Sequence, residues 1–309
     1  MAIHRYKFFR PTQAAQLRRL ELTVRGVVEG GFAGLHKSPH KGFSIEFAEH
    51  REYAPGDEIR HLDWTVLART DRYYIKQYEQ ETNLRATICL DASASMGYGK
   101  AGGGKKQKGP STEGVTKFEY AAVLAASMAY MLSNQQDLVG LTAFDNDICF
   151  EIPQGNGPSH LDQIFTRLEK LQPGKTTHVG AALHRLANKV PRRGLVILIS
   201  DLLDDPDEIL LALQHLRHAR HQLIVVQVLD RSETDLTQTR AVTFQDMEDG
   251  SRLQIDPKAI REDYQREVQA FLELIKLRCG QFQIDHVLAF TDVPWDVQIR
   301  EMLRRTSGG

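Results

Sequence analysis

Oxygen-bearing side chains follow directly after an apolar run, and their spacing suits a hard divalent cation. Asp91, Ser93 and Ser95 stand two residues apart, with alanines between them. They follow residues 86–90, Ala-Thr-Ile-Cys-Leu, a run typical of a buried strand. Carboxylate and hydroxyl oxygens are ligands of Mg²⁺, and Mn²⁺ or Ca²⁺ accepts the same donors. Such a cation can keep a position open for a carboxylate of another protein, so the pattern indicates binding before catalysis.

Two other stretches place oxygen donors where elements of an α/β sheet are expected to meet. Residues 175–180 read Lys-Thr-Thr-His-Val-Gly and open an Ala-rich helix, while Asp201 follows Ser200 at the end of the apolar run 195–199. In a doubly wound sheet, ligands bind beyond the carboxyl ends of the strands, where the strand order reverses. We therefore predict that the three loops meet there. The structural alternative is that Asp and Ser only cap helices at such turns.

Length, composition and charge limit the class of protein. The chain has 309 residues, is 41% hydrophobic and carries a formal net charge of −1, so no charge excess points to nucleic acid or an anionic membrane. Its apolar runs are strand-sized, well short of the roughly 20 residues that span a bilayer. The three cysteines show no zinc or redox spacing. We expect a cytoplasmic protein without membrane insertion.

The pattern of turns and apolar residues predicts two domains. Residues 1–82 combine a helix from Arg10 to about Val28 with a Gly-rich, loop-rich β module. Residues 83–309 alternate continuous apolar strands with amphipathic helices, which predicts an α/β fold with a doubly wound, mostly parallel sheet. A hairpin inserted near residues 240–256 is expected around Asp249-Gly250.

Taken together, the three loops resemble the metal-ion-dependent adhesion site of von Willebrand factor A domains, whose sheet is Rossmann-like. In that family a Gly-Gly-Thr run is followed four residues on by Ala-Leu. Counting back from Ala182-Leu183 gives Thr177, and because Lys175 and Thr176 replace the glycines, Thr176 is a second candidate. The resemblance implies that two serines and the threonine bind the metal directly or nearly so, with two aspartates acting largely through water. The implied set is Ser93, Ser95, Thr177, Asp91 and Asp201.

The charged stretch 46–69 resembles the signature of a bacterial family labelled domain of unknown function fifty-eight. There, Glu-Phe…Arg-x-Tyr-x-x-Gly-Asp…Arg-x-x-Asp-Trp…Ala-Arg precedes a von Willebrand A-like domain, and each of these positions matches. By itself the run would be interpreted as a solvated surface with Trp64 packed. The resemblance implies the short soluble subgroup, with a MoxR-type AAA+ ATPase or its client as partner. The signature residues expected at an interface are Glu46, Arg51, Asp57, Arg60, Asp63, Trp64 and Arg69.

These observations favour a non-enzymatic interaction module that captures an acidic side chain at a Mg²⁺ site. The alternative is a metal-dependent phosphoester hydrolase, in which Asp91 or Asp201 positions a metal-bound water. A third possibility is a scaffold with a vestigial metal site. Residues 99–105 fit Gly-x-x-x-x-Gly-Lys, but no Ser or Thr follows and no helix opens, so we expect a flexible insert and no phosphate loop.

Overall fold

The computed structural model divides the chain into two compact units, Val28–Asn83 and Met1–Val27 with Leu84–Gly309. The residues that it describes are 6–17, 20, 45–54, 62–80, 84–99, 114–174, 179–190, 193–235, 242–245, 252–255 and 257–307.

The smaller unit contains a two-stranded antiparallel sheet and one short helix. Strand β1 (Ile45–Glu52) pairs with β2 (Tyr74–Gln80), and α2 (Trp64–Thr70) lies between them in sequence. The helix begins where it does because Asp63 caps it: Asp63 Oδ1 accepts hydrogen bonds from the backbone N–H of Thr65 at 2.9 Å and of Val66 at 3.3 Å. The β-rich module predicted upstream is confirmed.

The larger unit is built on a six-stranded sheet with the order β10-β7-β6-β3-β4-β5. Neighbouring strands run parallel except β5, which pairs antiparallel with β4 at the edge. Chain order reverses between β3 and β6, so the sheet is doubly wound, as predicted. The strands are β3 (Arg85–Asp91), β4 (Leu138–Phe144), β5 (Ile148–Gly155), β6 (Leu195–Ser200), β7 (Gln222–Leu229) and β10 (Asp285–Phe290).

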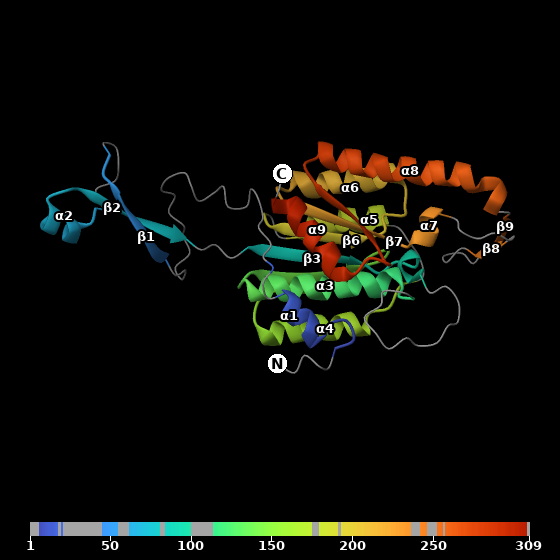
Figure 1. Cartoon of the computed structure of the whole chain (residues 1–309), viewed down its shortest axis with the longest axis horizontal. Helices are drawn as coiled ribbons and strands as arrows, with labels where there is room; N and C mark the ends of the chain where they lie inside the picture. The colour runs from blue at the N-terminus through green and yellow to red at the C-terminus, as the bar shows by residue number, and fades with distance from the viewer. Residues whose placement is uncertain are drawn as a thin grey trace. The chain divides into compact units, whose positions relative to one another are not determined.

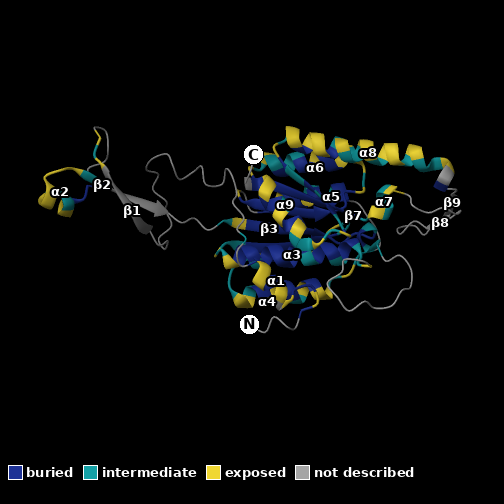
Figure 2. Ribbon diagram, in the orientation of Figure 1, coloured by how far each residue is buried: buried dark blue, intermediate teal, exposed yellow. Residues whose placement is uncertain are grey.

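Helices cover both faces of this sheet, and Figure 1 shows α3 and α4 on one side and α6 and α8 on the other. Alternate residues of β6 enter two separate cores: Leu195 and Ile197 join α3, whereas Val196 and Leu198 join α5 and α6. A strand buried on both faces must be apolar throughout, which explains the continuous runs in the sequence. Figure 2 accordingly shows the central strands of this sheet and α3 mostly buried. The larger helices are α3 (Lys117–Asn134), α4 (Pro158–Lys170), α5 (Val179–Lys189), α6 (Pro206–His218), α8 (Pro257–Gln281) and α9 (Trp295–Ser307).

Shorter elements lie in the connections. A 3₁₀ turn, η3 (Ser95–Gly97), follows β3, and α7 (Arg231–Asp235) follows β7. Strands β8 (Val242–Gln245) and β9 (Arg252–Ile255) form the predicted hairpin within residues 240–256. No helix in the described part of the chain combines the length and the apolar character needed to cross a membrane.

The N-terminal helix α1 (Pro11–Leu17) belongs to the larger unit, not to the β module with which we grouped it. It is also shorter, within the described residues, than the helix predicted from Arg10 to Val28. Aromatic contacts just before α1 attach this segment to the larger unit: Phe9, fully buried, stacks on Phe165 of α4 with ring centroids 4.9 Å apart, and Phe8 meets Phe118 of α3 edge-on. Helix α4, which supplies part of this surface, is absent from the sequence-based prediction.

Two matched substitutions test whether α1 is part of the larger core. Leu17 is 1% exposed and Leu211 on α6 is 59% exposed. We expect Leu17→Ala to lower the free energy of unfolding by about 2–5 kcal/mol, because a buried cavity replaces packed methyl groups. The same change at Leu211 should cost no more than about 0.5 kcal/mol. Urea unfolding of both variants measures this, and equal small losses would mean that α1 is not docked.

Candidate metal centre at the sheet edge

The first predicted loop forms a compact group of oxygen atoms at the end of β3. Asp91 is fully buried; its Oδ1 accepts a hydrogen bond from the backbone N–H of Ser93 at 2.8 Å. Its Oδ2 accepts one from the Ser200 hydroxyl at 2.5 Å. The hydroxyl oxygens of Ser93 and Ser95 lie 3.1 Å apart. The Asp91 carboxylate therefore stabilises the turn that follows it, as Asp does at tight turns. This turn places the Ser93 and Ser95 hydroxyls beside each other.

The third predicted loop lies beside the first because β6 is the parallel neighbour of β3 across the point where chain order reverses. Ser200 ends β6, and Asp201 follows it with no exposed surface. The Oδ1 of Asp201 accepts a hydrogen bond from the backbone N–H of Leu203 at 3.1 Å, and its Oδ2 accepts one from Lys117 Nζ at 2.8 Å. The structure thus brings Asp91, Ser93, Ser95 and Asp201 to one edge of the sheet.

The second predicted loop is described only at its two flanks, and Thr176 and Thr177 lie outside the described residues. On one flank, the backbone N–H of Gly174 donates to the Ala92 carbonyl of the first loop at 2.6 Å. A Cβ on Gly174 would lie 2.7 Å from Asp145 Oδ2, so a larger residue here would displace the Asp145 carboxylate. On the other flank, the N–H of Gly180 donates to Asp204 Oδ2 beyond the third loop at 3.1 Å. The threonine assignment remains a prediction.

The donor set suits a hard cation held mainly by neutral oxygens. Each carboxylate oxygen of Asp91 and Asp201 already accepts one hydrogen bond, and a second lone pair remains to accept another from a metal-bound water. The Ser93 and Ser95 hydroxyls offer direct ligands. Among the residues that the structure describes, no three His, Cys, Asp or Glu side chains cluster as a charged cage. The hydroxyls are thus essential to any site here.

Burial makes the charge on Asp91 costly. Desolvation, followed by the negative charge of Asp201, raises the pKa of Asp91 to about 7, although hydrogen bonds from Ser200 and Ser93 act in the opposite direction. A divalent cation beside this carboxylate would favour its ionised form and lower that pKa. The negative charge of Asp91 is therefore only partly compensated by its hydrogen bonds.

A lysine that we did not assign to the site supplies positive charge at this edge. Lys117, the first residue of α3, has a fully buried side chain, and its Nζ binds Asp201 Oδ2 at 2.8 Å and Glu233 Oε1 at 2.5 Å. Burial acts to lower the pKa of Lys117, but the charges of Asp201 and Glu233 outweigh it and raise the pKa. The sequence did contain a hint of this role, because a lysine at the N-terminus of a helix is unfavourable to the helix dipole unless carboxylates compensate it.

The upstream signature residues fall in several places. Glu46 and Arg51 lie on β1, while Asp57 and Arg60 lie outside the described residues. The remaining three lie on or beside α2: Asp63 is its buried N-cap, Arg69 is exposed in its last turn, and Trp64 is 62% exposed. Trp64, the first residue of α2, is therefore not packed, contrary to the expectation from sequence.

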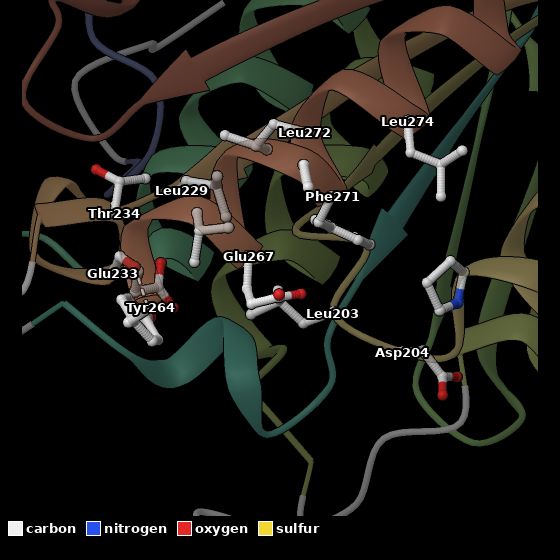
Figure 3. A pocket seen from close by; sticks show the side chains of 13 residues that line it. Leu203, Asp204, Leu229, Glu233, Thr234, Tyr264, Glu267, Phe271, Leu272 and Leu274 are labelled. Carbon is white, nitrogen blue, oxygen red and sulfur yellow. Dashed lines mark hydrogen bonds between the residues drawn. The ribbon is translucent and has the colours of Figure 1, made fainter. Parts of the chain in front are cut away.

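A pocket of about 660 Å³ borders the ion group on the face covered by α8. Figure 3 shows Leu203, Leu229 and Phe271 lining it together with Glu233 and Glu267. The walls are mainly apolar and the charged side chains that line it are acidic. Glu233 thus belongs both to the pocket wall and to the ion pair with Lys117.

Comparison with known proteins finds a matching family model and similar mycobacterial proteins. The family model described as Protein of unknown function DUF58 matches residues 49–271. The uncharacterized protein Rv1480 of Mycobacterium tuberculosis is 29% identical over 265 residues, covering 84% of this chain and 79% of that protein, and Mb1516 of Mycobacterium bovis matches equally.

Solved structures of similar fold share little sequence with the chain. An aerotolerance-related membrane protein of Bacteroides fragilis has a TM-score of 0.44 and 16% identity, covering 71% of this chain and 98% of that one. BatB of Bacteroides thetaiotaomicron has a TM-score of 0.44 and 16% identity, with 74% and 100% covered. The VWA domain of SpRpn10 has a TM-score of 0.39 and 12% identity, with 71% and 95% covered. With TM-scores below 0.5, these structures say nothing about the residues of the candidate metal centre.

A histidine behind the site makes stability depend on pH. His286 Nε2 donates to Gln227 Oε1 at 3.0 Å, and Gln227 Nε2 donates to the Asp201 carbonyl at 3.1 Å. Burial, then the charges of Arg305 and Lys276, lowers the pKa of His286 from 6.5 to about 4. Between these values the unfolded chain binds a proton that the folded protein does not, so stability is lost as pH falls.

We expect His286→Gln to flatten this pH dependence. A pKa difference of this size corresponds to a stability loss on the order of 3 kcal/mol between pH 6.5 and 4. Groups such as Asp137, whose pKa burial raises to about 6, titrate in both proteins and cancel in the comparison. Urea unfolding of wild type and variant at several pH values gives the two curves. Parallel curves would contradict the assignment.

Proposed function

This chain belongs to the DUF58 family, and we propose that within it the chain is a non-enzymatic, metal-dependent protein-interaction module. The observation that carries the proposal is the pair of hydroxyls, Ser93 and Ser95, 3.1 Å apart where the strand order reverses. Neutral ligands leave a Mg²⁺, Mn²⁺ or Ca²⁺ ion short of negative charge. Such an ion attracts an acidic side chain of another protein as an additional ligand.

The partner follows from the family resemblance and from the smaller unit. That resemblance implies a MoxR-type AAA+ ATPase or its client, with this chain as adaptor or co-chaperone. Trp64 supports a protein partner, because an indole that is 62% exposed is a typical anchor residue of interfaces. Arg69, exposed on the same short helix, adds a charged contact.

One observation favours the alternative, a metal-dependent phosphoester hydrolase. The pKa of Asp91 at about 7 is that of a general base suited to neutral pH. Against this, Asp91 has no exposed surface and both its carboxylate oxygens already accept hydrogen bonds from Ser93 and Ser200. A group so enclosed holds a loop or a metal-bound water more readily than it contacts a substrate. The binding module is therefore the better-supported proposal.

Two serine variants test the metal-dependent capture. Ser93 and Ser127 are both fully buried, but only Ser93 lies at the candidate metal centre; Ser127 is in α3. We expect Ser93→Ala to weaken capture of a purified MoxR-type ATPase in millimolar MgCl₂ by at least about tenfold, because a metal ligand is lost. Ser127→Ala should behave as wild type.

Chelation and a turnover assay complete this test. EDTA should abolish capture by wild type, and capture that persists in EDTA would reject the proposal. We expect no turnover of generic phosphoesters with Mg²⁺ or Mn²⁺. Turnover that is lost in Asp91→Ala would establish the hydrolase instead.

A second pair of variants tests the smaller unit. We expect Trp64→Ala to weaken capture by about 30-fold, the loss of about 2 kcal/mol typical of a buried interface anchor. Stability should change by no more than about 0.5 kcal/mol, since the side chain is exposed in the free protein. Tyr73→Ala, at an aromatic residue 57% exposed in the same unit, is the matched control. Equal effects of the two changes on capture would argue against a specific interface at Trp64.

A further inference from the structure

A buried ammonium group shares a carboxylate with the candidate metal centre. Lys117 Nζ lies 2.8 Å from Asp201 Oδ2 and 2.5 Å from Glu233 Oε1, and the Lys117 side chain is completely enclosed. A positive charge at the first residue of α3 is opposed by the helix dipole, so the lysine is held there by the two carboxylates. Asp201 is also the third-loop member of the metal set.

The charges around Lys117 determine how strongly this edge attracts a divalent cation. Three carboxylates, Asp91, Asp201 and Glu233, lie along the edge, and Lys117 cancels one of their charges. Both oxygens of Glu233 are engaged, Oε1 by Lys117 and Oε2 by the backbone N–H of Asp230 at 2.8 Å. Without Lys117, both Asp201 and Glu233 would offer uncompensated charge to a divalent ion. With it, the ion meets fewer negative charges and a nearby positive one.

We infer that Lys117 is a built-in monovalent counter-cation that sets the divalent-cation affinity of this edge. It weakens resident metal binding and leaves the bound ion under-neutralised, so that an incoming carboxylate completes the charge balance. This inference rests on the proposed metal centre and adds the residue that tunes it. It also explains how the fold tolerates buried carboxylates before a metal arrives, because the ammonium already neutralises part of their charge.

Two variants should move the affinity in opposite directions. Lys117→Met removes the ammonium at similar side-chain length, and we expect Mg²⁺ binding to tighten by at least about tenfold. Glu233→Gln removes a carboxylate and leaves Lys117 with Asp201 alone, so Mg²⁺ binding should weaken by about tenfold. Lys7→Met is the matched control: Lys7 pairs with Glu119 at 3.0 Å, but its side chain is 61% exposed. Isothermal titration with MgCl₂ measures all three.

Thermal unfolding gives an independent readout. In EDTA, Lys117→Met should lower the Tm by about 10 °C, since two carboxylates lose their counter-charge, and MgCl₂ should restore more of the Tm than it adds to wild type. A purely structural lysine would give a loss that Mg²⁺ does not restore. If Lys117→Met does not fold even with Mg²⁺, Glu233→Gln decides, because it removes one of the two carboxylates and leaves Lys117 paired with Asp201.

The outcomes separate this inference from the proposed function. Mg²⁺ binding that responds to both variants as expected, without capture of the ATPase, would reject the proposed function and keep the inference. Wild type without detectable Mg²⁺ binding, but Lys117→Met with it, would do the same. The inference is overturned if Lys117→Met binds Mg²⁺ no more tightly than wild type, or if wild type binds Mg²⁺ measurably and Glu233→Gln does not weaken that binding.

Discussion

The ion pair of Lys117 with Asp201 and Glu233 is the interaction on which the carboxyl edge of the sheet depends. It joins the start of α3, the loop after β6 and helix α7 after β7; Lys117 and Asp201 are fully buried and Glu233 is mostly buried. Removing the lysine leaves buried negative charge without compensation, which is far more costly than losing a surface pair. The geometry of the neighbouring Asp91 loop is therefore fixed by charges as well as by packing.

The sheet itself explains why these groups meet. Chain order reverses between β3 and β6, and helices leaving the two strands cover opposite faces. This divergence leaves the polar loops at the strand ends without a helix above them. Ser200, at the end of β6, then crosses to Asp91 of β3 with a hydrogen bond of 2.5 Å. An apolar scaffold thus ends in a concentrated polar edge.

Local patterns made much of the fold predictable. Strands buried on both faces read as continuous apolar runs, as in β6 and β7, and Asp249-Gly250 falls between the strands of the observed hairpin. The prediction failed where the position of an element depends on contacts between segments that are distant in sequence. Helix α1 joins the larger unit through Phe9 and Phe165, which lie far apart in sequence. Trp64 is exposed on α2, although its size and apolar character led us to expect it packed.

The sequence by itself determined the Asp-x-Ser-x-Ser turn, because its hydrogen bond from Ser93 to Asp91 spans only two residues. It also determined that Ser200 and Asp201 stand at the carboxyl end of a buried strand, Ser200 as its last residue and Asp201 just after it. Only the tertiary structure decided that the Lys117 ammonium pairs with the carboxylates of Asp201 and Glu233. Lys117 is 84 residues from Asp201 and 116 from Glu233. Whether a lysine side chain is exposed or buried depends on its neighbours in the fold. Burial of its ammonium group is tolerated only where carboxylates lie close enough to pair with it.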